Sequence, residues 1–253
     1  DKRINGPAFY YMKIASATNA RTMIGTILFD SPSVYSLCQL ICADLRLDAW
    51  LELSSVLNSF MFDYIVRMRL GGLNLTGYVL HEAPIPRLLR QLAGNIALHA
   101  AALSFPHVRF APVWCILSED NPLLDKGAAW KQLWSVSQND RMRRRCILDS
   151  IVASIYGLTV HEMEWILRDC DLPFQDINGD IIARTLDPKG FWRVDKDKDP
   201  ELRHTVLNLV AFHDLEEKIH ACGGDREKGI EAFLNQNDGE GWMLPETLRL
   251  ADY

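Results

Sequence analysis

The sequence predicts an α+β protein that is mostly helical, with a small mixed β platform near its N-terminus. Aromatic and β-branched residues gather in two short segments, 8–15 and 22–29, which is typical of strands. Farther along, apolar residues recur at steps of three and four, the spacing of an amphipathic helix, most clearly over 49–70. A hydrophobic content of 48% over 253 residues is sufficient for a substantial core.

The first elements follow from these patterns in chain order. The polar turn 17–21 joins the two predicted strands, and residues 34–46 are expected to be helical. The helix predicted over 49–70 buries one face, and the opposite stripe carries Glu52, Ser55, Ser59, Asp63 and Arg67. Gly71-Gly72 is expected to end this helix with a left-handed cap.

The rest of the chain is predicted to be largely helical. The capping box Thr159–Glu162 starts one of these helices, and Gly157 ends the one before it. The remaining predicted elements are a strand at 73–80, a helix at 86–103, a strand-like run at 108–117, helices at 123–156 and 160–169, an irregular polar stretch at 171–199, and helices near 200–220 and 226–235.

The net charge of −6 is unevenly spread over three predicted regions. Residues 1–110, the target-recognition-like region discussed below, carry 10 Lys and Arg against 7 Asp and Glu, net +3. The helical region 111–186 carries 8 against 11, net −3, and the acidic helical C-terminal region 187–253 carries 9 against 15, net −6. A polyanionic partner is therefore expected to contact the first region and to be repelled by the last.

The sequence indicates a cytoplasmic protein that does not enter a membrane. Its six cysteines are scattered, without the spacing of a zinc site, and are expected to be reduced thiols. No apolar run reaches the roughly 18 residues that a membrane span needs. The chain opens at Asp1 in mid-pattern, so we expect it to be a piece of a longer protein.

Several short motifs follow one another between about residues 8 and 170. SATNART (16–22) precedes an apolar strand, LNSFMFDY (57–64) is followed by Arg67 and GGLNL (71–75), and PIP stands at 84–86. Leu148-Asp149 and the later YGL (156–158) complete the series. Their order resembles the C-terminal target-recognition region of type IIG-like adenine-N6 DNA methyltransferases of restriction-modification and phage-defence systems, including those of the BREX and DISARM kind.

The resemblance implies DNA target recognition, with double-stranded DNA and a methyltransferase catalytic domain or partner subunit as partners. The catalytic motifs of that family are absent from this chain. It has neither a glycine-rich loop for S-adenosylmethionine nor an Asn/Asp-Pro-Pro-Tyr/Phe loop, and Asn121-Pro122-Leu123 only begins like the latter. We therefore expect S-adenosylmethionine in a separate catalytic domain, no cofactor in this chain, and no catalytic or metal-binding residue here.

The resemblance and the charge pattern together nominate ten residues for DNA contact. Arginines could hold phosphates or guanine edges, and asparagines could pair with adenine or with backbone oxygens. The densest basic cluster, with Lys126 and Lys131 nearby in the sequence, is suited to a phosphate backbone. The candidates are Asn19, Arg21, Asn58, Arg67, Arg69, Asn74, Arg141, Arg143, Arg144 and Arg145.

Structural roles remain open for these residues. Asp63 and Arg67, four apart on one helix, could form a solvated ion pair, and Asn19 could serve only to close its turn. The arginines of 141–145 could form a solvated helix face paired to Asp140 and Asp149. Two other classes of function also remain: a protein-interaction or docking module of a defence complex, and an enzyme of unfamiliar type.

Overall fold

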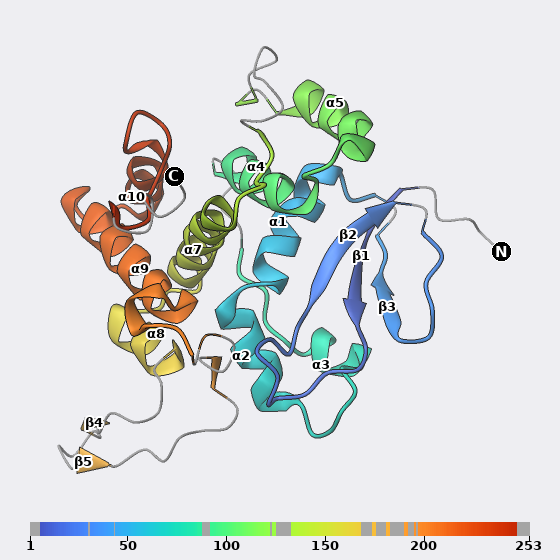
Figure 1. Cartoon of the computed structure of the whole chain (residues 1–253), viewed down its shortest axis with the longest axis horizontal. Coiled ribbons are helices and arrows are strands. Elements are labelled where there is room, and N and C mark those ends of the chain that lie inside the picture. The colour runs from blue at the N-terminus through green and yellow to red at the C-terminus, as the bar shows by residue number, and fades with distance from the viewer. Residues whose placement is uncertain are drawn as a thin grey trace.

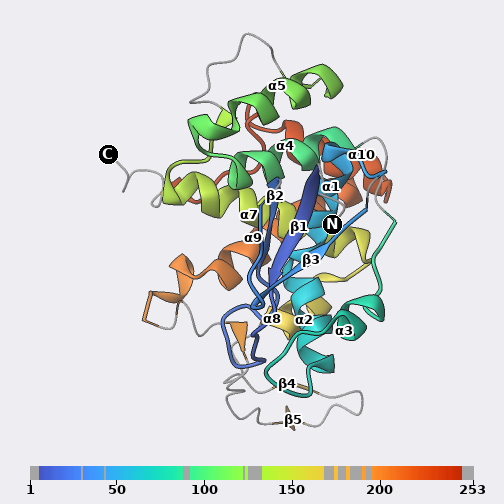
Figure 2. The ribbon, with the colours of Figure 1, turned by 90° about the vertical axis from the view of Figure 1, so that its right-hand side faces the viewer.

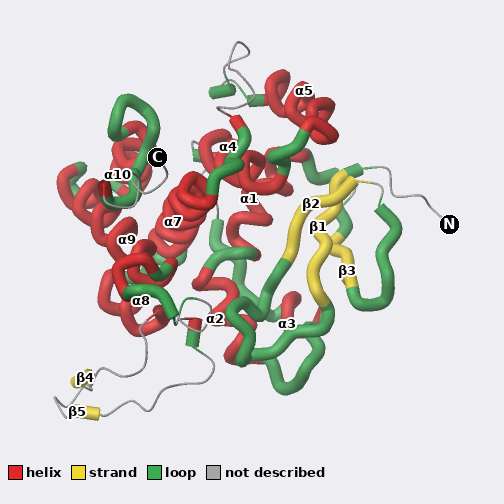
Figure 3. Tube along the Cα trace, viewed as in Figure 1, coloured by secondary structure: helices red, strands yellow, loops and turns green. Residues whose placement is uncertain are grey.

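The computed structural model describes residues 6–29, 31–42, 44–87, 92–121, 123–124, 133–167, 174–175, 181–182, 190–191, 195 and 197–246 (Figure 1). Over these ranges the protein is mostly helical, with a small three-stranded sheet near the N-terminus (Figure 3). The predicted α+β class is therefore confirmed. Lys126 and Lys131, which lie near the basic cluster in the sequence, are outside the described residues.

The sheet is antiparallel and has the strand order β2-β1-β3. Its strands are β1 (Pro7–Met12), β2 (Gly25–Phe29) and β3 (Leu37–Leu40). Phe9 of β1 lies opposite Ile27 of β2 and Leu40 of β3. The helix predicted over 34–46 was wrong, because pairing with β1 gives residues 37–40 backbone partners that a local pattern does not reveal.

The helix predicted over 49–70 is divided into α1 (Leu47–Leu57) and α2 (Phe60–Arg69). Ser59 separates them as the N-cap of α2, where its hydroxyl accepts a hydrogen bond from the Phe62 N–H. The left-handed cap expected at Gly71-Gly72 was also wrong. Leu70 ends α2 in an extended conformation, and neither glycine has a positive φ.

Two predicted strands are helical in the structure. Within 73–80 only Asn74 pairs, in an isolated bridge with Ile14, and α3 (Gly77–His81) follows. Residues 108–117 form the 3-10 turn η1 (Val108–Phe110) and the first part of α5 (Ala111–Asp120). The His107 side chain accepts from the Arg109 N–H and starts this turn, so local capping outweighs the β propensity of the sequence.

The remaining helices match the sequence more closely. Ser137 caps α7, Gly157 follows its end with φ 79°, and Thr159 and Glu162 form the predicted capping box of α8. The elements are α4 (Ala93–Ser104), α7 (Gln138–Ile155), α8 (Val160–Leu167), β4 (Phe174–Gln175), β5 (Ile181–Ile182), η3 (Pro200–Leu202), α9 (His204–Ala221) and α10 (Arg226–Asn235).

Helix α1 lies at the centre of the arrangement. The strands β1 and β2 pack on one side of it, and α4 and α7 pack against it as well (Figure 1). Helix α9 packs on α7 and in turn contacts α8 and α10. When the sheet faces the viewer, α7, α8, α9 and α10 lie behind it (Figure 2). One continuous cluster of buried apolar side chains joins these layers, with Phe9, Trp50 and Phe212 among its largest members.

Among the described helices, none combines the length and the apolar character that crossing a bilayer requires.

Candidate functional site

A pocket of about 480 Å³ lies where the start of β2, α1, α4 and α7 meet. It brings together four of the ten sequence candidates, which come from three separate parts of the chain. Its charged and amide-bearing lining residues are Arg21, Asn58, Arg141, Arg145, Asp149 and His204. We call this hollow the arginine pocket.

The turn that carries Arg21 is fixed to α2 by a buried ion pair. Asp63 accepts the backbone N–H groups of Thr22 and Met23 through Oδ1, at 2.7 and 2.6 Å. Its Oδ2 lies 2.8 Å from Nη2 of Arg67. The same Nη2 donates to the carbonyl oxygens of Asn19 and Ala20, so two side chains hold two backbone N–H groups and two carbonyl groups of the turn.

Asp63 and Arg67 therefore do form an ion pair, but it is not the solvated pair that the sequence analysis considered. Their side chains are only 1% and 4% exposed, and Glu52, Ser55 and Ser59 of the predicted polar stripe are buried too. Asp63 and Arg67 are buried because the turn at residues 19–23 is bonded to them, and α7 also packs against both α1 and α2. The Arg67 guanidinium, 4.0 Å from the Phe191 ring centroid, stabilises the turn and does not face a ligand.

Arg21 extends from this turn over the aromatic ring of Phe60. Its guanidinium carbon lies 3.5 Å from the ring centroid, a close cation–π contact. Nη2 donates to Oδ2 of Asp149 at 3.4 Å. Nη1 is buried, and no hydrogen-bond acceptor for it is found in the described part of the chain. Arg21 therefore retains an unused donor at the pocket.

Asp149 of α7 connects three segments that are distant in sequence. Its Oδ1 accepts from the Phe60 N–H at 2.8 Å, in the first turn of α2, where a carboxylate is favoured by the helix dipole. Its Oδ2 approaches both Arg21 and Nε2 of His204, each at 3.4 Å. Burial lowers the pKa of His204, more than the nearby Asp149 carboxylate raises it, so the ring is neutral near pH 7.

Arg141 and Arg145 of α7 supply the rest of the positive charge. Arg141 donates through Nη1 to the carbonyl oxygens of Leu103 and Ser135, each at 3.1 Å, and neither acceptor is charged. Arg145 is exposed, and it makes no ion pair or hydrogen bond with any residue that the structure describes. Partial desolvation, with Arg141 and Arg21 nearby, lowers the pKa of Arg145, an arginine that remains charged.

The other two arginines of the basic cluster turn away from the pocket. Arg143 and Arg144 both pair with Asp140, at 2.8 and 2.9 Å. These arginines lower the pKa of Asp140 to about 2 although its burial acts in the opposite direction. Burial also lowers the pKa of His99 to about 3, and its neutral Nδ1 accepts from Arg144 at 3.2 Å. The predicted pairing to Asp140 is thus confirmed for these two residues.

The remaining candidates have different positions. Asn58 lines the pocket, but its amide is engaged, since Oδ1 accepts from the Gly25 N–H and Nδ2 donates to the Ser54 carbonyl. Asn19, Arg69 and Asn74 are exposed and do not line the pocket. Backbone contacts of Asn19 close its turn, as the structural alternative for this residue predicted.

Sequence reasoning missed several lining residues. His204, Ser54, Ser55 and Ser104 were not candidates, although all four line the pocket. Ser54 and Ser55 precede Asn58 by one helical turn, a spacing that could have drawn attention to them. His204 had no sequence signal, because its approach to Asp149 depends on the packing of α9 against α7.

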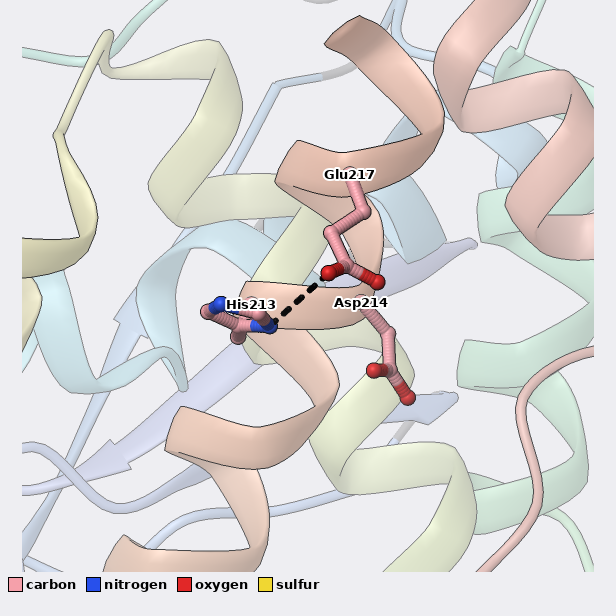
Figure 4. A group of neighbouring side chains, drawn as sticks. All are labelled: His213, Asp214 and Glu217. Carbon is pink, nitrogen blue, oxygen red and sulfur yellow. Dashed lines mark ion pairs between the residues drawn. The ribbon is translucent and has the colours of Figure 1, made fainter. Parts of the chain in front are cut away.

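A second group of polar side chains lies on α9, outside the pocket. His213, Asp214 and Glu217 have ligand atoms within 4.8 Å of one another (Figure 4). Asp214 already accepts a 2.7 Å hydrogen bond from Trp242 through Oδ2, and the His213 and Glu217 side chains are 58% and 68% exposed. Such exposed acidic groups are common on helices, and we assign no metal to them.

Comparison with protein-family models, curated proteins and solved structures finds no significant match to this chain. The function is therefore argued from the arginine pocket and its surroundings.

Proposed function

We propose that this chain recognises double-stranded DNA as the target-recognition part of an adenine-N6 DNA methyltransferase in a restriction or phage-defence system. The observation that carries the proposal is the convergence of Arg21, Arg141 and Arg145, which lie up to 124 residues apart in the sequence, on one pocket. A convergence of guanidinium groups creates a local positive potential on a protein whose net charge is −6. Phosphate contacts of this kind supply much of the affinity for DNA.

Arg145 is the residue best suited to a duplex backbone. It is exposed, and within the described ranges it forms no close ion pair, although the Asp149 carboxylate attracts it at longer range. Arg143 and Arg144 support binding less directly, because Asp140 neutralises part of their charge. The exposed Arg69 and Asn74 lie outside the pocket and would make separate contacts at most.

The chemistry of methylation belongs, in this proposal, to a separate domain that holds S-adenosylmethionine. A cytoplasmic location accompanies the proposal. It is supported by Cys38, Cys42, Cys115, Cys146 and Cys222, all of which are free thiols in the structure.

The test is a fluorescence-anisotropy titration of a labelled random duplex at several salt concentrations. Arg145→Glu should weaken binding by about tenfold and reduce the slope of log K against log salt by about one. Arg87→Glu is the matched control, since Arg87 is exposed and does not line the pocket. Absence of duplex binding by the wild-type chain, or equal binding by the two variants, would contradict the proposal.

A docking module is the second candidate, favoured by a different observation. Backbone contacts join three segments that carry exposed apolar side chains. The Met12 N–H bonds to the Ile24 carbonyl, and Ile14 forms a β-bridge with Asn74, which follows Leu73. Ile14 and Leu73 are 63% and 67% exposed. Such side chains often mark contact with another protein. Mixing the chain with the methyltransferase catalytic fragment and measuring complex formation by gel filtration tests this candidate, with Ile14→Asp as the variant expected to abolish it.

A further inference from the structure

Among the residues that the structure describes, those lining the arginine pocket carry more positive than negative charge. Arg21, Arg141 and Arg145 contribute three positive charges, Asp149 one negative charge, and the buried His204 is neutral, which gives a net charge of +2. Arg21 pairs with the carboxylate of Asp149, whereas the acceptors of Arg141 in the described part of the chain are two carbonyl oxygens. A ligand with two negative charges would balance the pocket, and a phosphate monoester carries about −1.5 to −2 near pH 7.

One donor in the pocket is poorly satisfied without a ligand. Nη1 of Arg21 is buried, and no acceptor lies within hydrogen-bond distance of it among the residues described. A buried donor that lacks an acceptor is unfavourable, and the guanidinium also stacks on Phe60. A smooth duplex lying across the surface would meet the exposed Arg145 first. Only a group that enters the pocket can approach Arg21.

The dimensions of the pocket exceed those of a bare anion. Its volume of about 480 Å³ lies within the range of roughly 300–1,000 Å³ that is common for small-molecule sites. Apolar side chains from the segment just before β2, from α4 and from α7 also line the pocket, and we call them the apolar wall. Its members are Met23, Ile24, Ala100, Leu103 and Leu148. A ligand that combines a phosphate with a flat, largely apolar body would fill both parts.

Hydroxyl groups in the same pocket favour a body that carries an amino group. Ser54 and Ser55 line the pocket, and both hydroxyls donate to the carbonyl oxygen of Leu51, at 2.7 and 3.0 Å. Because their protons are used in this way, their oxygen atoms present lone pairs and act as acceptors. The exocyclic amine of adenine or cytosine is a donor of the required kind.

We infer that the arginine pocket is a binding site for a nucleoside 5′-phosphate, with the phosphate at Arg21, Arg141 and Arg145 and the base against the apolar wall. This goes beyond duplex recognition, because the ligand enters the pocket and does not lie across its mouth. The same chemistry occurs in a free mononucleotide and at the phosphorylated 5′ end of a DNA strand.

The experiment is isothermal titration of the full chain with deoxyadenosine 5′-monophosphate, deoxyadenosine and inorganic phosphate in separate runs. The nucleotide should bind more tightly than either of its parts. Arg145→Gln should weaken nucleotide binding by about tenfold, the equivalent of about 1.4 kcal/mol, and Arg87→Gln should leave it unchanged. Arg145 makes no hydrogen bond or close ion pair with a described residue, and Asp149 attracts it only at longer range, so its variant is expected to unfold near the wild-type temperature, which a thermal scan checks.

No binding of the nucleotide at millimolar concentration would overturn the inference, as would equal affinity for inorganic phosphate or an unaffected Arg145→Gln variant. A single-stranded oligonucleotide with a 5′-phosphate, compared with its 5′-hydroxyl form, identifies the source. A preference for the phosphorylated strand assigns the site to DNA ends, and equal binding of the two strands assigns it to free nucleotide. Duplex binding without nucleotide binding would reject this inference alone, whereas the reverse result would reject only the proposed function.

Discussion

The guanidinium of Arg67 and the carboxylate of Asp63 form an ion pair of 2.8 Å that is almost fully buried. Together these side chains hold the backbone of the turn that ends at Arg21. They consequently fix where the Arg21 guanidinium meets Phe60 and Asp149. The pocket depends on this pair although neither residue lines it.

Removal of one member of the pair is expected to be strongly destabilising. Arg67→Met leaves the Asp63 carboxylate buried without its cation, and this should lower the free energy of unfolding by about 3–5 kcal/mol. Urea denaturation measures the loss. Arg69→Met is the matched control on the same helix, because Arg69 is exposed and its replacement should change stability by no more than about 0.5 kcal/mol. Equal effects of the two replacements would show that the buried pair contributes nothing.

Glu52 should make stability depend on pH. Burial raises its pKa from 4.5 to about 7, and Asp48 acts in the same direction. The folded state therefore binds more protons than the unfolded state between these values, and stability falls as the pH rises through this interval. Glu52→Gln removes the penalty, so at about pH 8 the variant should exceed wild type by roughly 2 kcal/mol, with little difference at about pH 4.

Urea titrations of both proteins at the two pH values measure this difference. Glu119→Gln, at an exposed position of α5, serves as the control and should show no such dependence. A constant difference between Glu52→Gln and wild type across this pH range would contradict the assigned ionisation.

The N-cap of α7 should be a local contribution to stability. The Ser137 hydroxyl accepts from the Asp140 N–H at 3.0 Å, and Ser137 is otherwise exposed. Ser137→Ala should therefore lower the free energy of unfolding by about 1 kcal/mol, whereas Ser137→Asp should retain most of it. Thermal unfolding distinguishes the two variants. If both behave alike, the cap is not the source of the effect.

Gly229 should be intolerant of a side chain. A Cβ at this position of α10 would lie 2.8 Å from the backbone nitrogen of Ile219 in α9, and still closer to two other Ile219 atoms. Gly229→Ala is thus expected to separate α9 from α10, at about 1–3 kcal/mol. Gly72→Ala meets no atom within 4 Å and should be nearly neutral. Circular dichroism during urea titration provides the comparison, and equal midpoints would refute close packing at Gly229.

Sequence reasoning succeeded where the determining interactions are local. Helix α10 begins and ends at the predicted residues 226 and 235, and the capping box Thr159–Glu162 forms as expected. It failed at β3 and at α5. Strand β3 exists because β1 supplies its backbone partners, and α5 follows a turn that the His107 side chain caps. Apolar content alone does not distinguish these outcomes.

The candidate site shows the same division. Arg21, Arg141 and Arg145 were identified from charge and motif, and the structure brings them to one pocket. Arg67 was nominated on the same grounds, but it is buried in an ion pair and bonded to the carbonyl groups of the turn at residues 19–20, which depends on tertiary packing. The contribution of His204 depends on contact between α9 and α7, which no spacing in the sequence encodes.

The Asp149 carboxylate bonds to Phe60, 89 residues earlier in the chain, and to Arg21, 128 residues earlier. Closing such long loops is entropically costly and slows folding. While the protein is being synthesised, the N-terminal segment with Arg21 and Phe60 leaves the ribosome long before α7 does. Nascent chains therefore lack the arginine pocket, and its lining is complete only after translation has passed position 204.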